Sequence, residues 1–185
     1  MSTDNSRNQI LDAAQTLFYQ RGFHATSISD IANKAGVFKG NLAYYFKSKQ
    51  SLLQAVADNR LAQLEETLAG FANFATPRER LSAFIGMVED TRKNLARHGC
   101  PMGSLSTEIG KTSLPKEHTR ALLDYCLNWL HGEFNKIEPK SAKQHAETLL
   151  AMAQGTALLA HNFNNEELVR RQCQAMHQWL RVITD

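Results

Sequence analysis

The sequence predicts an all-α protein of about nine helices, and three observations support this fold class. Apolar residues recur at three- and four-residue intervals along nearly the whole chain, and the alternating pattern of β-strands is absent. Only 4 prolines and 10 glycines occur in 185 residues, so few turn signals interrupt the helical pattern. Residues 26–49 have the layout of two short helices joined by a tight turn. We therefore predict an N-terminal three-helix, helix-turn-helix DNA-binding domain over residues 1–50. A long helix joins it to a second α-helical domain over residues 51–185.

The first helix is expected to run from about Ser6 to Arg21, where Gly22 ends it. Its apolar residues fall on one face, and they are Ile10, Ala13, Ala14, Leu17 and Phe18. An apolar stripe of this kind needs a partner surface, which we expect the next two helices to supply.

Residues 27–46 carry the signals of the helix-turn-helix itself. Ser27, followed three residues later by Asp30, resembles a capping box that opens the second helix. Gly36 lies where the tight turn requires a left-handed backbone. Leu42 and Phe46, four residues apart, are expected to anchor the third helix to the other two. In such motifs the N-terminal end of this last helix faces the major groove of DNA.

A long fourth helix is expected from Ser48 to about Asn73, a span of roughly 40 Å. Its apolar residues again repeat at three- and four-residue steps, and they are Leu53, Ala57, Leu61, Leu64, Leu68 and Phe71. The next helix has a clear start, because Thr76 is a capping residue, Pro77 suits the first helical position and Glu79 can return to the cap. Its predicted inward residues are Leu81, Phe84, Val88, Thr91 and Leu95.

The His-Gly-Cys-Pro stretch at 98–101 should break that helix, and a short amphipathic helix follows over 102–110. Pro115 opens a further helix, whose inward residues are Leu123, Cys126, Leu130 and Phe134. The last two helices are expected to begin at Ser141 and Asn164, each a capping residue with Gln or Glu three positions later. The first of these two helices is rich in small residues: Ala146, Ala151, Ala153, Gly155, Ala157 and Ala160. The second repeats an apolar, coiled-coil-like seam made of Val169, Cys173, Met176, Leu180 and Ile183.

Charge and cysteine content narrow the classes of function. Residues 1–50 hold six Lys or Arg and three Asp, which accounts for the whole net charge of +3. Positive charge in that segment suits contact with phosphates. The three cysteines lie far apart, so neither a disulfide framework nor a CxxC metal pair is expected. The sequence shows no signal peptide and no apolar run of the length that crosses a membrane, so we expect a cytoplasmic protein with no membrane partner.

The N-terminal third of the chain resembles the tetracycline-repressor (TetR-like) family of bacterial transcriptional regulators. The segments that carry this resemblance are Thr26-Ser27-Ile28-Ser29-Asp30-Ile31-Ala32, Ala35-Gly36-Val37, Gly40-Asn41-Leu42-Ala43-Tyr44-Tyr45-Phe46-Lys47-Ser48-Lys49 and Leu52-Leu53. The resemblance implies a homodimeric repressor that binds an inverted-repeat operator in double-stranded DNA and is released by a small-molecule effector. It implies neither an enzyme nor a bound cofactor or metal.

The resemblance implies contacts to DNA from one compact set of residues: Thr26, Ser27, Phe38, Lys39, Gly40, Asn41, Tyr44, Tyr45 and Lys49. Asn41 has the amide that can pair with adenine, and Lys39 can reach a guanine or a phosphate. Gly40 has no side chain, so the backbone can approach DNA closely. Tyr44 is expected to point to DNA, and Tyr45 either to a phosphate or into the core.

Three residues of this set, Thr26, Ser27 and Lys49, resemble the phosphate clamps of the family. Thr26 and Ser27 lie at a helix N-terminus. Two residues depart from the family pattern. Phe38 stands where a small polar cap is usual, and it can pack either on a thymine methyl group or into the core. Ala43 stands where a tyrosine is common. Both departures concern the contacts to DNA and leave the fold unchanged.

Recognition of an inverted repeat requires two copies of the chain, and the last two helices suit this role. Small residues allow helices to approach closely, and an apolar seam lets two helix pairs form a four-helix bundle. The alternative is that both stripes belong to the core of a single chain, and part of each must do so.

The resemblance implies that residues 51–185 form an α-helical effector-binding and dimerisation domain, with an effector pocket in the C-terminal helices. The candidate lining residues are Phe84, Val88, Cys100, Met102, Leu105, Tyr125 and Trp129, and each apolar one is equally suited to ordinary core packing. Cys100 lies at a helix break in a stretch that resembles a Gly-Cys-x-x-Gly-x-Leu segment of some family members, a few of which sense electrophiles or oxidants through that cysteine. The neighbouring His98 would favour its thiolate. The alternative is an inert thiol at a packed corner.

Two other chemistries find less support in the sequence. Cys173 and His177 have the four-residue spacing of a metal pair, but no further ligands accompany them. A thiol enzyme using Cys100 and His98 would lack a group to orient the base, and no nucleophile elbow or phosphate loop occurs. A purely structural helical module would not need lysines and an asparagine beside a glycine turn.

Overall fold

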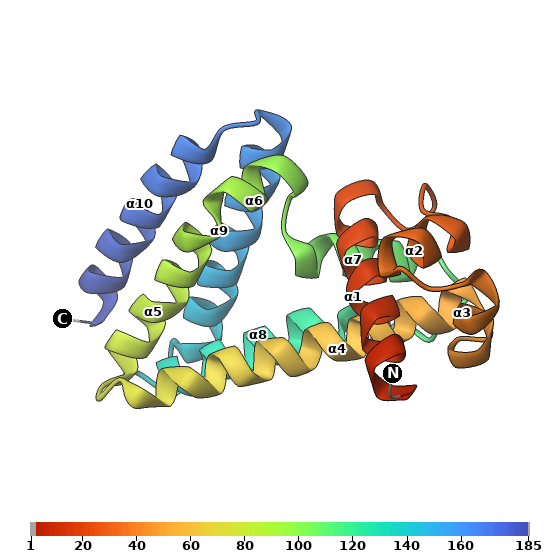
Figure 1. Ribbon diagram of the computed structural model, residues 1–185. Coiled ribbons are helices and arrows are strands. Elements are labelled where there is room, and N and C mark those ends of the chain that lie inside the picture. The colour runs from red at the N-terminus through yellow and green to blue at the C-terminus, as the bar shows by residue number, and fades with distance from the viewer. Residues whose placement is uncertain (1–2, 185) are drawn as a thin grey trace. The chain divides into compact units, whose positions relative to one another are not determined.

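The computed structural model describes residues 3–184, apart from the side chains of residues 3, 4, 116 and 119. Within this range the chain is all-α, as predicted, and contains no strand (Figure 1). The helices are α1 (Thr3–Arg21), α2 (Ile28–Ala35), α3 (Lys39–Tyr45), α4 (Lys49–Gly70), the short 3₁₀ helix η1 (Phe71–Asn73), α5 (Pro77–Asp90), α6 (Arg92–His98), α7 (Pro101–Gly110), α8 (Lys116–Asn135), α9 (Ala142–Asn162) and α10 (Glu166–Thr184).

The described residues form ten α-helices, where the sequence predicted about nine, because the helix that begins at Pro77 is interrupted at Thr91. The Thr91 hydroxyl donates to the carbonyl oxygens of Met87 at 3.1 Å and Val88 at 3.0 Å. Thr16, Thr67 and Thr148 make the same bond to the residue four positions earlier within unbroken helices, so this bond accompanies the break and does not explain it. Helix α6 starts directly after Thr91.

The structure confirms three of these predicted helix starts and corrects one. Ser27 and Thr76 both form complete capping boxes, the second with Pro77 in the first turn. Ser141 is the N-cap of α9, as predicted, but its side chain makes no capping bond. At the start of α10 the cap is Asn165, whose side-chain oxygen accepts from the Leu168 N–H at 3.0 Å, and the predicted Asn164 instead adopts a left-handed backbone with φ of 46°.

The chain packs as two compact units, and the first comprises residues 1–62 and 104–122. Its core is formed by side chains from α1 to α4, α7 and α8, including Ile10, Leu17, Ile31, Leu42, Leu52, Ile109 and Leu122. Polar contacts also join its segments: Asn59 donates to the Gln15 side chain at 2.9 Å, and Gln54 lies 2.7 Å from His118 Nδ1. Residues 104–122 thus belong with the N-terminal helices in packing, although they lie far along the chain.

The second unit comprises residues 63–103 and 123–185, and α10 packs against α5, α6 and α9 within it. The predicted seam of α10 is mostly internal, because Val169, Cys173, Met176 and Leu180 are all buried. The small residues Ala146, Ala153, Ala157 and Ala160 of α9 are buried as well. These stripes therefore form the core of a single chain, which was the alternative to a dimer seam.

Helix α4 continues without a break from Lys49 in the first unit to Gly70 in the second. The packing units do not divide the chain at residue 50, because α4 up to Ala62 and the segment 104–122 pack with the N-terminal helices. The division into a domain over 1–50 and a domain over 51–185 describes function and stays a prediction.

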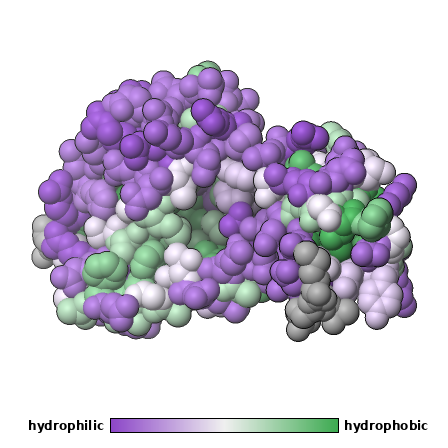
Figure 2. All heavy atoms as spheres, in the orientation of Figure 1, coloured by the Kyte–Doolittle hydropathy of each residue, from purple (hydrophilic) through white to green (hydrophobic). Residues whose placement is uncertain are grey.

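A buried carboxylate connects α5 and α8 in the second unit. Glu133 is 5% exposed and accepts from Arg80 Nε at 2.7 Å and from Lys136 Nζ at 2.6 Å. Arg80 also donates to the carbonyl oxygen of Phe74 at 2.7 Å, so it fixes the connection from η1 to α5. Figure 2 shows hydrophobic side chains around this end of α4 and η1, where Phe74 is 44% exposed.

Replacement of Arg80 by leucine should therefore destabilise the protein. The change leaves Glu133 in a buried position with only Lys136 beside it, and we expect a loss of about 3 kcal/mol in the free energy of unfolding. Urea unfolding followed by circular dichroism measures this loss. Arg170→Leu is the matched control, because its ion pair with Glu167 is exposed, and it should leave the unfolding midpoint nearly unchanged. Equal losses for both variants would contradict the role assigned to Arg80.

Candidate nucleic-acid interface

The first turn of α2 is fixed by reciprocal hydrogen bonds. The Asp30 N–H donates to Ser27 Oγ at 3.1 Å, and the Ser27 N–H and hydroxyl donate to Asp30 Oδ2 at 2.8 and 2.6 Å. These bonds, the side-chain one first, lower the pKa of Asp30. The cap therefore contributes stability at neutral pH, and this contribution is lost as the pH falls through the lowered pKa. The amides of Ile28 and Ser29 lie in the same turn, where a helix has no internal acceptor for them.

Gly36 ends α2 and directs the chain into α3. Its backbone is left-handed, with φ of 67° and ψ of 30°. The Gly36 N–H donates to the Asn33 carbonyl at 3.2 Å, and the Val37 N–H donates to the Ala32 carbonyl at 3.1 Å. The predicted requirement for glycine at this turn is therefore confirmed in the backbone geometry.

Helix α3 has seven residues, and two buried side chains set its orientation. Leu42 is 1% exposed and Phe46, directly after the helix, is 6% exposed. Since these two side chains point inward, the opposite face of α3 is exposed. Lys39, Gly40 and Asn41 lie on the exposed N-terminal turn of the helix.

The two aromatic side chains next to this turn are unusually exposed. Phe38 precedes α3 with an extended backbone, makes no side-chain cap and is 85% exposed. Tyr44 is 79% exposed, and its ring contacts the half-buried Tyr45 with centroids 5.1 Å apart. Of the two positions considered for Phe38, the structure excludes packing into the core. Tyr45 is partly exposed, which is compatible with both alternatives, a phosphate contact and packing into the core.

The three predicted phosphate contacts differ in their surroundings. Ser27 is exposed, at the start of α2. Lys49 is partly buried, and its ammonium lies 4.3 Å from the centre of the Phe23 ring. Thr26 is 1% exposed, and its hydroxyl donates to the Gly22 carbonyl at 2.8 Å. The Thr26 side chain thus holds the corner between α1 and α2, which is a correction to its assignment as a phosphate ligand.

Basic residues outside the predicted set also lie in this unit. Arg7 of α1 has its guanidinium 5.5 Å from the centre of the Phe46 ring. Lys34 and Lys47 are exposed, one near the end of α2 and the other just after α3. In the sequence these residues stand out only by their charge. The contact between Arg7 and Phe46 could not be predicted from the neighbouring residues, because the two are 39 positions apart.

Most of the predicted effector residues lie in one apolar cluster of the second unit. Phe84 and Val88 belong to its buried core, and Cys100, Met102, Tyr125 and Trp129 pack against that core while partly exposed. The rings of Phe84 and Trp129 lie 6.2 Å apart. Leu105 is buried in the first unit, so it does not belong to this cluster.

Cys100 precedes α7, and its sulfur accepts from the Gly103 N–H at 3.5 Å. Gly103 is tightly packed, because a Cβ there would lie 2.9 Å from the side-chain oxygen of Gln154. Burial, with a smaller effect of Cys100, raises the pKa of Cys126 to about 12, and burial chiefly raises that of Cys173 to about 11. Cys173 is buried in the core, whereas His177 Nδ1 lies 3.3 Å from Ser82 Oγ.

Comparison with known proteins supports the reading of this site. Residues 10–56 match the model of bacterial regulatory proteins of the tetR family. An HTH-type transcriptional regulator from the lacX 3′ region of Lactococcus lactis subsp. lactis is 31% identical over 108 residues, which cover 57% of this chain and 55% of that protein. The chain thus matches about half the length of this relative.

Solved structures resemble the chain over almost its whole length. A TetR-family transcriptional regulator from Agrobacterium tumefaciens has a TM-score of 0.84 at 22% identity, with 96% of this chain and 98% of that chain covered. The regulator FadR of Bacillus subtilis, in complex with stearoyl-CoA, has a TM-score of 0.72 at 22% identity and covers 94% of this chain and 96% of its own. At this identity the likeness establishes the fold. Over residues 3–184, no helix is long and apolar enough to span a membrane.

Substitution of two glycines by alanine should have different effects on stability, because one lies in the turn and the other in the helix that follows it. Gly36→Ala places a side chain on a left-handed backbone, and we expect a loss of roughly 1 kcal/mol in the free energy of unfolding. Gly40→Ala is the matched control, because Gly40 lies in α3 and has open space where a Cβ would stand. It should be neutral or slightly stabilising in thermal unfolding. A larger loss for Gly40→Ala than for Gly36→Ala would contradict this geometry.

Proposed function

This chain belongs to the tetR family of bacterial regulatory proteins, and from that premise we propose that it is a homodimeric transcriptional repressor released from its operator by a small-molecule effector. It is a DNA-binding transcriptional regulator with a helix-turn-helix. The repressor role, the dimer and the effector are our proposal. The observation that carries it is the exposed N-terminal turn of α3, held at a fixed orientation by Leu42 and the Gly36 turn.

The proposed base contacts come from the first turn of α3. Asn41 is exposed there, and its amide can both donate to and accept from adenine in the major groove. Lys39, the first residue of α3, would contact a guanine or a phosphate. Gly40 presents no side chain and no neighbour within 4 Å of a Cβ position, so the helix can lie close against the bases.

The proposed backbone contacts surround that turn. The first amides of α2 have no acceptor within the helix, so they would donate to a phosphate at this helix N-terminus. The Ser27 hydroxyl donates to Asp30 and would have to exchange that bond to contact the same phosphate. Lys49 supplies a charge from the start of α4, and the Phe23 ring beneath it limits the directions its chain can take. Tyr44 and Phe38 expose large apolar surfaces that DNA would cover, with a thymine methyl group as the natural partner of Phe38.

We propose that the dimer forms through the exposed faces of α9 and α10. The internal seam of α10 is unavailable for this purpose because it is buried within one chain. Large apolar side chains nevertheless remain exposed on these elements: Leu158, Leu159 and Phe163 at the C-terminal end of α9, and Val182 near the C-terminal end of α10. Burial of these side chains between two copies would support a symmetric interface, which would match an inverted-repeat operator.

The proposed effector site is the apolar cluster around Phe84 and Trp129. An apolar ligand fits such surroundings, and the fold is shared with a regulator that was solved with stearoyl-CoA. An electrophilic or oxidising effector would instead act at Cys100, which is partly exposed beside this cluster. Cys126 and Cys173 are buried with raised pKa values, so Cys100 is the thiol best placed for such chemistry.

We assign no catalytic activity, in keeping with relatives that are transcriptional regulators. Contact with chromosomal DNA places the protein in the bacterial cytoplasm in this proposal. Selection of bound genomic fragments tests the proposal as a whole, because a repressor of this type should enrich fragments that contain an inverted repeat. Recovery of random fragments only, at low and moderate salt, would refute sequence-specific binding.

Two substitutions in the DNA-binding unit should have different effects on binding. Asn41→Ala removes a base contact, so we expect its affinity for the selected operator to fall by roughly 1–3 kcal/mol while affinity for random DNA is kept. Lys49→Ala removes a phosphate contact, so it should weaken both and lower the salt slope by about one unit. Fluorescence anisotropy at several salt concentrations measures both quantities. Equal losses on operator and random DNA for Asn41→Ala would argue against base recognition.

Alkylation tests the proposed role of Cys100. In the folded protein iodoacetamide should modify Cys100 and spare Cys126 and Cys173, because burial disfavours both thiolates at neutral pH. Peptide mass spectrometry locates the modification, and all three thiols should react in urea. Loss of operator affinity on alkylation, absent in Cys100→Ser, supports a sensing role. Complete modification of Cys100 with unchanged operator affinity would contradict a sensing role and would indicate that the residue serves only in packing.

A further inference from the structure

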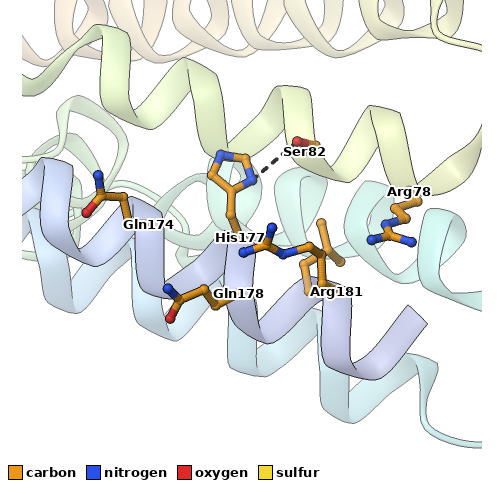
Figure 3. Close-up of a pocket in the computed structure, with 7 residues that line it drawn as sticks. Arg78, Ser82, Gln174, His177, Gln178 and Arg181 are labelled. Carbon is orange, nitrogen blue, oxygen red and sulfur yellow. Dashed lines mark hydrogen bonds between the residues drawn. The ribbon is translucent and has the colours of Figure 1, made fainter. Parts of the chain in front are cut away.

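A polar groove lies between α5 and α10 in the second unit, apart from the apolar effector cluster. Its volume is about 650 Å³, which is within the size range of small-molecule sites. The polar lining consists of Arg78, Ser82, Gln174, His177, Gln178 and Arg181 (Figure 3). Buried Leu180 forms part of its floor. Neither the DNA contacts nor the proposed effector cluster uses any of these residues.

The lining is rich in hydrogen-bond donors and contains no carboxylate. Arg78 comes from α5 and Arg181 from α10, so the two walls of the groove each contribute one guanidinium. A guanidinium has five N–H donors and no acceptor, and its fork matches the oxygens of a carboxylate or phosphate. The two glutamines add amide donors that tolerate either kind of oxyanion. The composition of the groove therefore favours an anion.

Side chains from both helices meet at one point of the groove. Figure 3 shows the Arg181 side chain reaching back along α10 toward the His177 ring, which is bonded to Ser82 of α5 at 3.3 Å. Burial lowers the pKa of His177, Glu89 of α5 acts in the opposite direction, and Arg181 adds a smaller lowering effect. The Arg181 side chain and the Ser82–His177 pair thus lie close to one another in the groove.

We propose that this groove binds a small organic anion that carries carboxylate or phosphate groups. Arg181 and Arg78 hold its oxyanions from opposite walls, and the two glutamines and Ser82 complete the hydrogen bonding. The surface over α10 is mostly hydrophilic in Figure 2, which suits a polar ligand in this groove. The site is independent of DNA binding, so its presence or absence leaves the proposed repressor function unaffected.

Isothermal titration calorimetry of the full chain without DNA tests this site. The probes are citrate and inorganic pyrophosphate, each at constant ionic strength, with sodium chloride as the blank. We expect saturable binding of at least one probe, weakened about tenfold by Arg181→Gln and by Arg78→Gln. Arg171→Gln is the matched control, because Arg171 is exposed on α10 and does not line the groove. Its affinity should equal that of the wild type.

The outcomes separate the possible ligands and occupants. Binding of citrate only assigns polycarboxylates to the groove, binding of pyrophosphate only assigns phosphorylated compounds, and either supports the proposal. Absence of saturable binding for both probes would overturn it, as would an equal loss in Arg171→Gln, which would indicate diffuse surface charge. Sedimentation of Arg181→Gln completes the test: a changed oligomeric state without probe binding would make the groove a contact between copies of the chain. Thermal unfolding of each variant verifies that it is folded.

Discussion

Burial of Leu42 and Phe46 is the interaction on which the DNA-binding surface depends. Helix α3 has only seven residues, and a helix of that length is not stable alone in water. Its conformation and its rotation are therefore set by the side chains that it packs into the first unit. Once Leu42 points inward, the spacing of the helix directs Asn41 and Lys39 outward. The left-handed turn at Gly36 then fixes how α3 follows α2.

The second unit uses its apolar residues in a different way. Almost every residue of the α10 seam is buried where α10 packs against α5, α6 and α9. The small residues of α9 allow the neighbouring helices to approach it closely. The apolar side chains left at the surface, chiefly Phe163 and Val182, do not follow from the seam pattern. A heptad-like repeat thus identifies a helix with one apolar face but does not tell whether the partner helix belongs to the same chain.

Features governed by neighbouring residues could be predicted from the sequence, and features governed by distant ones could not. The capping boxes at Ser27 and Thr76 involve residues three positions apart, and the turn at Gly36 is a property of one backbone position. The burial of Thr26 depends on how α1 meets α2, and its hydroxyl is consumed by the Gly22 carbonyl. The cap of α10 depends on which of two adjacent asparagines bonds the backbone, and it is Asn165.

The same reasoning explains why the groove between α5 and α10 had no sequence signal. Arg78 and Arg181 are separated by about a hundred residues, and each alone reads as a solvated charge on a helix. Only the packing of α10 against α5 places them on facing walls.

Regulation requires that the two halves of the chain influence one another, and α4 is the covalent element that both share. Its first residue, Lys49, lies over Phe23 in the DNA-binding unit, and Leu64 and Leu68 belong to the apolar core of the second unit. A helix of 22 residues with an unbroken backbone is stiff on this scale, so a change in packing around Leu68 cannot be absorbed within α4 as a flexible linker would absorb it. In the proposed function, an effector that binds one packing of the second unit better than another would act on DNA binding through this helix. A nearly complete switch needs about 5.5 kcal/mol of such preference, which corresponds to roughly a 10⁴-fold difference in effector affinity. Burial of a large apolar ligand against the Phe84–Trp129 cluster, at about 25 cal/mol per Å², reaches that preference with a few hundred Å² that only one packing can offer.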